Sequence, residues 1–124
     1  MKILVIDDEP RRATAFVRAG HDIRVAHGFE QIQFLLRDVA SFWKPDLVVM
    51  DHDMPLLDGQ GVLQTFGLDI SIYPVLLWSC NPVGSQKMLR VLEDLQEQYD
   101  LTKRIHVQSF CNDPVYAGDV LKNF

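Results

Sequence analysis

The sequence predicts an α/β fold in which helices cover both faces of a five-stranded parallel sheet. Short, continuously apolar runs end in turn-forming residues, which is typical of strands buried on both faces of a parallel sheet. Segments with the apolar spacing of amphipathic helices alternate with these runs, so that the β-α unit repeats five times. Right-handed crossovers between parallel strands leave few topologies, and we predict the strand order 2-1-3-4-5.

The five predicted strands differ in how apolar they are. They are residues 2–6, 21–26, 47–51, 72–78 and 104–110. The first, third and fourth contain continuous apolar runs and are expected at the centre of the sheet. The second alternates, with Ile23 and Val25 separated by polar residues, and we therefore expect it to be more exposed.

The helices between the strands are predicted from apolar spacing and from their end residues. They are residues 10–20, 29–42, 60–66, 85–95 and 113–121. Pro10 suits a first helical position and Gly20 a C-cap. Phe16 and Val17 are among the residues expected on the buried face of the first helix. Ser85 is predicted as an N-cap, and glycines make the third helix a weak one.

The length and composition indicate a single globular domain spanning residues 1–124. Hydrophobic residues make up 48 % and charged residues 23 % of the 124 positions, which is ordinary for a soluble protein. The net charge of −5 argues against bulk binding of nucleic acid or anionic membranes. No apolar run is long enough to cross a bilayer. Two cysteines, Cys80 and Cys111, give no disulfide framework, so we expect a cytoplasmic location.

Carboxylates follow two of the predicted strands. Asp7 and Asp8 come after residues 2–6, and Asp51 closes residues 47–51. Ligands of open parallel sheets bind outside the carboxyl ends of the strands, and the predicted order makes these two strands neighbours. Acids that lie close together repel one another and need a cation, and oxygen ligands suit Mg²⁺ or Mn²⁺. The alternative is that Asp7 and Asp8 only solvate a strand end and cap the first helix.

Residues 45–59 carry the pattern Pro-Asp-x-x-x-x-Asp-x-x-Met-Pro-x-x-Asp-Gly. Together with the acid pair after the first strand and Ser79 after the fourth, it resembles the receiver domain of two-component response regulators. The resemblance covers the whole chain, so that we expect a single receiver-like domain over residues 1–124 with no output domain. It implies a flavodoxin-like, three-layer α/β/α sandwich. It implies that Asp51 is the phosphoacceptor, that Asp7 and Asp8 are metal ligands, and that the Ser79 hydroxyl meets a phosphoryl oxygen.

Gln108 departs from the receiver pattern. Receivers have a lysine at the end of the fifth strand, and Gln108 occupies that position. A neutral amide can donate a hydrogen bond to a phosphoryl oxygen, but it cannot supply the positive charge. We therefore expect Gln108 to bind phosphate as a neutral hydrogen-bond donor, which is a departure from the ordinary phosphorylation switch of receivers.

A second resemblance concerns the sequence Asp51-His52-Asp53 and the loop of residues 79–84. These elements look like the divergent branch called cyclic-phosphate-processing receiver-like domains. Members of that branch are inferred to act on phosphoesters such as terminal cyclic phosphates of RNA. The branch tends to have a histidine where this chain has Trp78, which weakens an acid–base role at that position.

Several residues near the predicted site have two alternative roles each. Asp53 is either a metal ligand or a turn-forming residue. His52 is either an exposed loop residue or a general acid or base beside the carboxylates. Asn81 and Gly84 either help to hold a phosphate at the start of a helix or belong to an ordinary strand-to-helix turn.

Three functions follow from these observations. The first is a stand-alone receiver-like domain that binds Mg²⁺ and is phosphorylated at Asp51, with a histidine kinase or another signalling protein as its partner. The second is a metal-dependent phosphoesterase, with Mg²⁺ or Mn²⁺ and a small phosphoester or an RNA-end cyclic phosphate as substrate. There, His52 or Asp53 would activate water. The third is a pseudo-receiver that only binds another protein.

Overall fold

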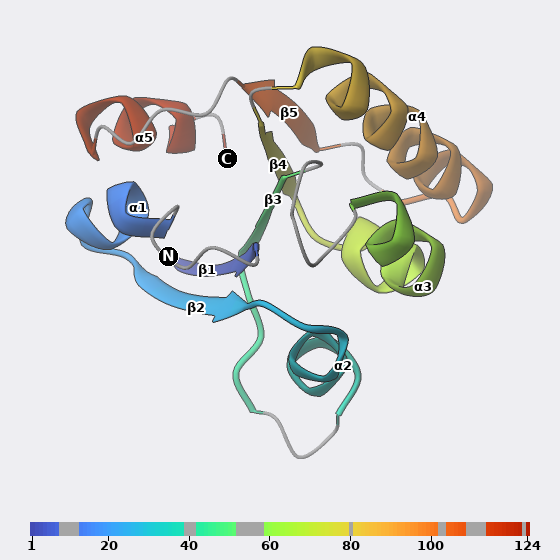
Figure 1. Cartoon of the computed structure of the whole chain (residues 1–124), viewed down its shortest axis with the longest axis horizontal. Coiled ribbons are helices and arrows are strands. Elements are labelled where there is room, and N and C mark those ends of the chain that lie inside the picture. The colour runs from blue at the N-terminus through green and yellow to red at the C-terminus, as the bar shows by residue number, and fades with distance from the viewer. Residues whose placement is uncertain are drawn as a thin grey trace.

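A five-stranded parallel sheet with the order β2-β1-β3-β4-β5 forms the centre of the molecule, which confirms the predicted topology. The computed structural model describes residues 1–7, 13–38, 42–51, 59–79, 81–101, 104–108, 114–122 and 124. The strands are β1 (Lys2–Ile6), β2 (Asp22–Ala26), β3 (Leu47–Met50), β4 (Val75–Trp78) and β5 (Ile105–Gln108). The helices are α1 (Thr14–Arg18), α2 (Phe29–Arg37), α3 (Gly59–Ser71), α4 (Pro82–Gln98) and α5 (Pro114–Leu121). Figure 1 shows α1 and α5 on one face of the sheet and α2, α3 and α4 on the other.

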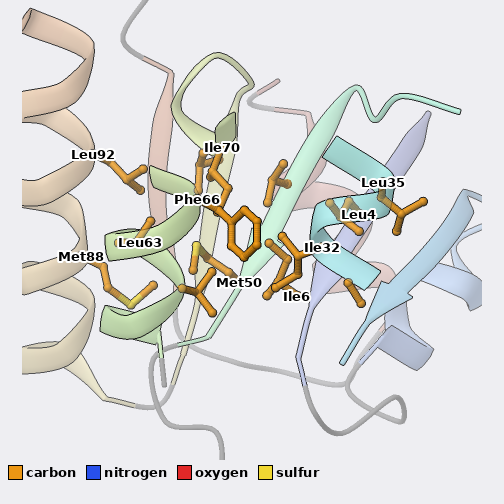
Figure 2. Packing of buried hydrophobic residues seen from close by; sticks show 14 of the residues in the cluster. Leu4, Ile6, Ile32, Leu35, Met50, Leu63, Phe66, Ile70, Met88 and Leu92 are labelled. Atoms are coloured by element: carbon orange, nitrogen blue, oxygen red, sulfur yellow. The ribbon is translucent and has the colours of Figure 1, made fainter. Parts of the chain in front are cut away.

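The face covered by α2, α3 and α4 holds the larger of two apolar clusters (Figure 2). The ring of Phe66 lies in the middle of this layer, between α3 and the sheet, and Met50 lies below it. The strand residues of this cluster are Leu4, Ile6, Ala26, Val48, Met50, Val75 and Leu77. In β1, β3 and β4 they are every second residue, as the alternation of side chains in a strand requires, and Ala26 comes from the end strand β2.

The face covered by α1 and α5 takes the alternate residues of the same strands. The second cluster contains Ile3, Val5, Leu47, Val49, Leu76 and Trp78 from the strands, with Ala15, Phe16, Val120 and Leu121 from the helices. Because both faces are covered, every buried position of the central strands β1, β3 and β4 is apolar. At the carboxyl end of each of these three strands, the residue that follows the strand is thus the first place where a polar side chain can lie.

Strand register brings the ends of β1, β3, β4 and β5 to the same edge of the sheet. Ile6 pairs with Met50, Met50 pairs with Leu77, and Trp78 pairs with Gln108. At the opposite edge, the Lys2 N–H donates to the Asp46 carboxylate at 2.8 Å, and the Asp46 N–H donates to the Lys2 carbonyl at 2.7 Å. These two bonds fix β3 against β1 before the strand begins.

Two predictions about single residues, Val17 and Ser85, are wrong. Val17 is 55 % exposed, whereas Ala15, which was not expected on the buried face of α1, is completely buried. Ser85 is not an N-cap, because α4 begins one turn earlier, at Pro82, with Asn81 as its N-cap. Gly20 does follow α1 in a left-handed conformation (φ +89°), and its N–H donates to the Val17 carbonyl at 3.0 Å, as a C-terminal glycine should.

Among the described residues, none of the helices combines the length and the apolar character that crossing a membrane requires.

Candidate functional site

Asp7 and Asp51 lie at the carboxyl ends of two neighbouring strands. Each directly follows one member of the Ile6–Met50 pair, and each is only 3 % exposed. The alternation along β1 and β3 directs both toward the face covered by α1 and α5. Burial of a carboxylate costs free energy unless hydrogen bonds or a cation compensate for the lost water. The structure therefore brings together two of the predicted site residues in a place suited to binding a ligand.

Ser79 follows β4, the strand next to β3, and is 5 % exposed. Its N–H donates to the Gln108 carbonyl at 3.2 Å, which continues the pairing of β4 with β5 past Trp78. The Ser79 Oγ accepts the N–H of Asn81 at 3.0 Å. A hydroxyl that accepts this bond still has its own proton to donate. Ser79 can thus act as a hydrogen-bond donor at the same sheet edge as Asp51.

Asn81 and Gly84 form the first turn of α4. The Asn81 Oδ1 accepts the Gly84 N–H at 3.0 Å, and the Asn81 carbonyl accepts the Ser85 N–H at 3.0 Å. Pro82 occupies the first turn, where its missing N–H costs nothing. The N–H groups of Gly84 and Ser85 thus donate within the turn. The predicted phosphate contacts of Asn81 and Gly84 stay predictions.

Gln108 ends β5 beside Trp78, and its side chain contacts α5. The Tyr116 O–H donates to the Gln108 Oε1 at 3.1 Å. The Tyr116 ring also lies 5.7 Å from the Trp78 ring, measured between centroids, with 32° between the planes. Sequence reasoning missed Tyr116, because nothing in the residues around it marks an aromatic side chain that reaches the end of a distant strand.

The described part of the chain contains no group of three or more acidic, histidine or cysteine side chains placed to hold a metal ion. The predicted metal set also includes Asp8 and Asp53, which lie outside the described residues, as does His52. The two described members, Asp7 and Asp51, supply only oxygen donors from buried positions. This donor chemistry fits a hard divalent cation such as Mg²⁺.

Solved structures of similar fold include response regulators and the receiver domain of a histidine kinase. The receiver domain of the hybrid histidine kinase CckA is 18 % identical over 98 % of this chain and 96 % of that chain, with a TM-score of 0.61. The response regulator TrrA from Thermotoga maritima, solved with Mg²⁺-BeF, is 22 % identical over 99 % and 98 %, with a TM-score of 0.59. The phosphorylated cyanobacterial phytochrome response regulator RcpA is 20 % identical over 98 % and 88 %, with a TM-score of 0.62.

No protein-family model and no curated sequence matches the chain. The likeness to solved structures extends over nearly the full length of this chain and over nearly all of the CckA domain and TrrA. The strand order and the placement of helices on the two faces agree with it. The chain therefore has the fold of response-regulator receiver domains.

Proposed function

We propose that this chain is a receiver-type signalling domain in which Asp51 accepts a phosphoryl group. The observation that carries the proposal is the buried carboxylate of Asp51 at the end of the central strand β3, beside the buried Asp7. Binding at the carboxyl ends of strands is general for open α/β sheets. The fold, shared with phosphorylated RcpA and with TrrA bound to Mg²⁺-BeF, supports the same reading.

The proposed reaction is a phosphoryl transfer to a carboxylate. An oxygen of Asp51 forms a bond to phosphorus while the bond from phosphorus to the leaving atom of the donor breaks, and the leaving group departs with that electron pair. The product is an acyl phosphate on Asp51. The Ser79 hydroxyl and the Gln108 amide would donate hydrogen bonds to the phosphoryl oxygens. Gln108 contributes no charge, unlike a lysine.

A divalent cation belongs to the proposal because the acceptor and the phosphodonor are both anionic. Asp7 and Asp51, with Asp8 and Asp53, would hold Mg²⁺. Bound Mg²⁺ would supply the positive charge that offsets the repulsion between the carboxylates and the transferring group. Mn²⁺ accepts the same oxygen ligands. A histidine kinase or another signalling protein would be the physiological partner; CckA, a hybrid histidine kinase, contains a receiver domain of this fold.

Intact-mass measurement after incubation with acetyl phosphate and Mg²⁺ tests the proposal. We expect the wild type to gain the mass of one phosphoryl group and Asp51→Asn to gain none. Asp94→Asn makes the same chemical change at an exposed position of α4 and should behave as the wild type. Equal labelling of Asp51→Asn and wild type would contradict the assignment of the acceptor, and no labelling of the wild type would contradict the function.

A metal-dependent phosphoesterase is the second candidate, favoured by the neutral Gln108 at the end of β5. A site that lacks the positive charge of a lysine is less suited to holding a stable acyl phosphate. This activity needs His52 or Asp53 to activate water, and both lie outside the described residues. Assays with cyclic and linear phosphoesters in Mg²⁺ or Mn²⁺ test it. Hydrolysis that survives Asp7→Asn and Asp51→Asn would contradict a role for this site.

A further inference from the structure

Tyr116 is held in a row of packed aromatic rings that crosses one face of the sheet. Its ring lies against Trp78 of β4, whose ring centroid is in turn 5.3 Å from that of Phe16 in α1. Phe16 is completely buried and Trp78 is 3 % exposed. Contact with the buried Trp78 ring on one side restricts the rotamers that the partly buried Tyr116 can adopt. The phenol oxygen of Tyr116 is thus held where a hydrogen bond from it can orient a neighbour.

That neighbour is Gln108, through the bond of 3.1 Å from the Tyr116 O–H to the Gln108 Oε1. A glutamine amide is planar, with an acceptor oxygen at one corner and an NH₂ group with two donors at the other. Engaging the oxygen therefore also fixes the direction of the NH₂ group. A lysine has no acceptor and could not receive this bond. The contact is specific to the amide that this chain has at the end of β5.

The register relates Gln108 to the proposed phosphoacceptor. Asp51 follows Met50, the partner of Leu77, and Trp78, the next residue of β4, pairs with Gln108. Asp51, Trp78 and Gln108 therefore lie at one level on three neighbouring strands. Their side chains belong to the face covered by α1 and α5, on which Trp78 contacts both helices. The amide and the carboxylate thus share one edge and one face of the sheet.

We propose that Tyr116 is a positioning residue that holds the Gln108 amide with its NH₂ donors toward a phosphoryl group on Asp51. The inference rests on the proposed function. It adds an explanation of how a neutral side chain at this position can donate hydrogen bonds to a phosphoryl group. The fixed donor pair takes the place of a mobile ammonium group. The hydrogen bond from α5 replaces the pre-organisation that charge attraction would otherwise provide.

The rate of phosphorylation by acetyl phosphate in four proteins tests the coupling: wild type, Tyr116→Phe, Gln108→Ala and the double variant. We expect Tyr116→Phe to slow adduct formation about three- to tenfold, the effect of losing one neutral hydrogen bond. In the Gln108→Ala background, Tyr116→Phe should have no further effect, because there is no amide to position. Equal effects of Tyr116→Phe in both backgrounds would overturn the inference. Tyr99→Phe, at a half-exposed tyrosine after α4, is the matched control and should leave the rate unchanged.

The NMR signals of the Gln108 side-chain NH₂ group give a readout that needs no phosphoryl transfer. In protein labelled with ¹⁵N-glutamine, the signals are assigned by their loss in Gln108→Ala. We expect a shifted, ordered pair in the wild type and a mobile pair with random-coil shifts in Tyr116→Phe, while the fluorescence of Trp78 and Trp43 shows an unchanged fold. The same mobile pair in the wild type would overturn the positioning role.

The two readouts separate the failure of this inference from that of the proposed function. A wild type that forms no adduct contradicts the function, and with it any role of the amide toward phosphate, even if the NH₂ signals are ordered. A wild type that forms the adduct at a rate insensitive to Tyr116→Phe and to Gln108→Ala overturns the inference alone. Adding Mg²⁺ and beryllofluoride, a phosphoryl analogue, should shift the ordered NH₂ signals in the wild type but not in Asp51→Asn.

Discussion

The ring of Phe16 supports the face of the sheet that carries the candidate site. It is completely buried and packs against Trp78, the residue directly before Ser79. We expect Phe16→Ala to lower the free energy of unfolding by about 3–5 kcal/mol, because it removes a buried ring and leaves a cavity. Urea denaturation followed by tryptophan fluorescence measures this. Phe16→Leu should cost less, about 1.5 kcal/mol, because it keeps most of the apolar volume.

Phe42 provides the matched control for that measurement. It is 95 % exposed, so that Phe42→Ala should change the unfolding free energy by less than about 0.5 kcal/mol. Similar losses in Phe42→Ala and Phe16→Ala would contradict the assignment of Phe16 to the core.

Burial of single residues is the part of the structure that sequence patterns predicted least well. Phe16 was expected in the core and is there, but the neighbouring Val17 is exposed and Ala15 is buried. In a helix of only five residues, apolar spacing does not define one face, and contact with α5 decides which side is covered. The contact of Tyr116 with Gln108 could not be predicted from the sequence either, because it depends on how α5 packs against the end of β5.

At the level of elements, the start of α4 depends on one side chain. The Asn81 Oδ1 accepts the Gly84 N–H, and the helix follows directly on the loop after Ser79. We expect Asn81→Ala to lower the unfolding free energy by about 1 kcal/mol, because a backbone donor loses its partner. Asn81→Ser keeps a capping oxygen and should retain most of the stability. Urea denaturation of the three proteins distinguishes them, and an equal loss in Asn81→Ser and Asn81→Ala would contradict the capping role.

The existence and type of the elements were predictable, but the lengths of several helices were not, as α2 and α3 illustrate. The helix expected over 29–42 ends at Arg37, and Phe42 is not helical. The helix expected over 60–66 extends over Gly59–Ser71. Its glycines predicted a weak helix. Gly67, however, is buried where α3 packs closely against α4, and an added Cβ would lie 2.8 Å from the Leu95 Cδ1. Tertiary packing outweighs the low helix propensity of glycine there.

At the scale of the whole molecule, the strand order is what creates the candidate site. Apolar runs that end in acids predicted β1 and β3, and the crossover rule made them neighbours, as the structure confirms. Asp7 and Asp51 could therefore be placed together from the sequence alone. The exact partners at that edge could not, because side-chain direction beyond the last paired residue depends on loops whose geometry no periodic pattern describes.

The same arrangement predicts that folding stability and metal binding are linked. Two buried carboxylates that follow neighbouring strands repel one another when both are ionised. A cation bound between them stabilises the folded chain, by about 2.7 kcal/mol at one hundred times its Kd.

We expect the Tm of the wild type to be higher in Mg²⁺ than in EDTA. Asp7→Asn should have a higher Tm than the wild type without metal, because the repulsion is removed, and should gain little from Mg²⁺. Asp94→Asn should respond to Mg²⁺ as the wild type does. A Mg²⁺ response of equal size in Asp7→Asn would show that the cation binds elsewhere, and no response in the wild type would remove the metal from the proposed chemistry.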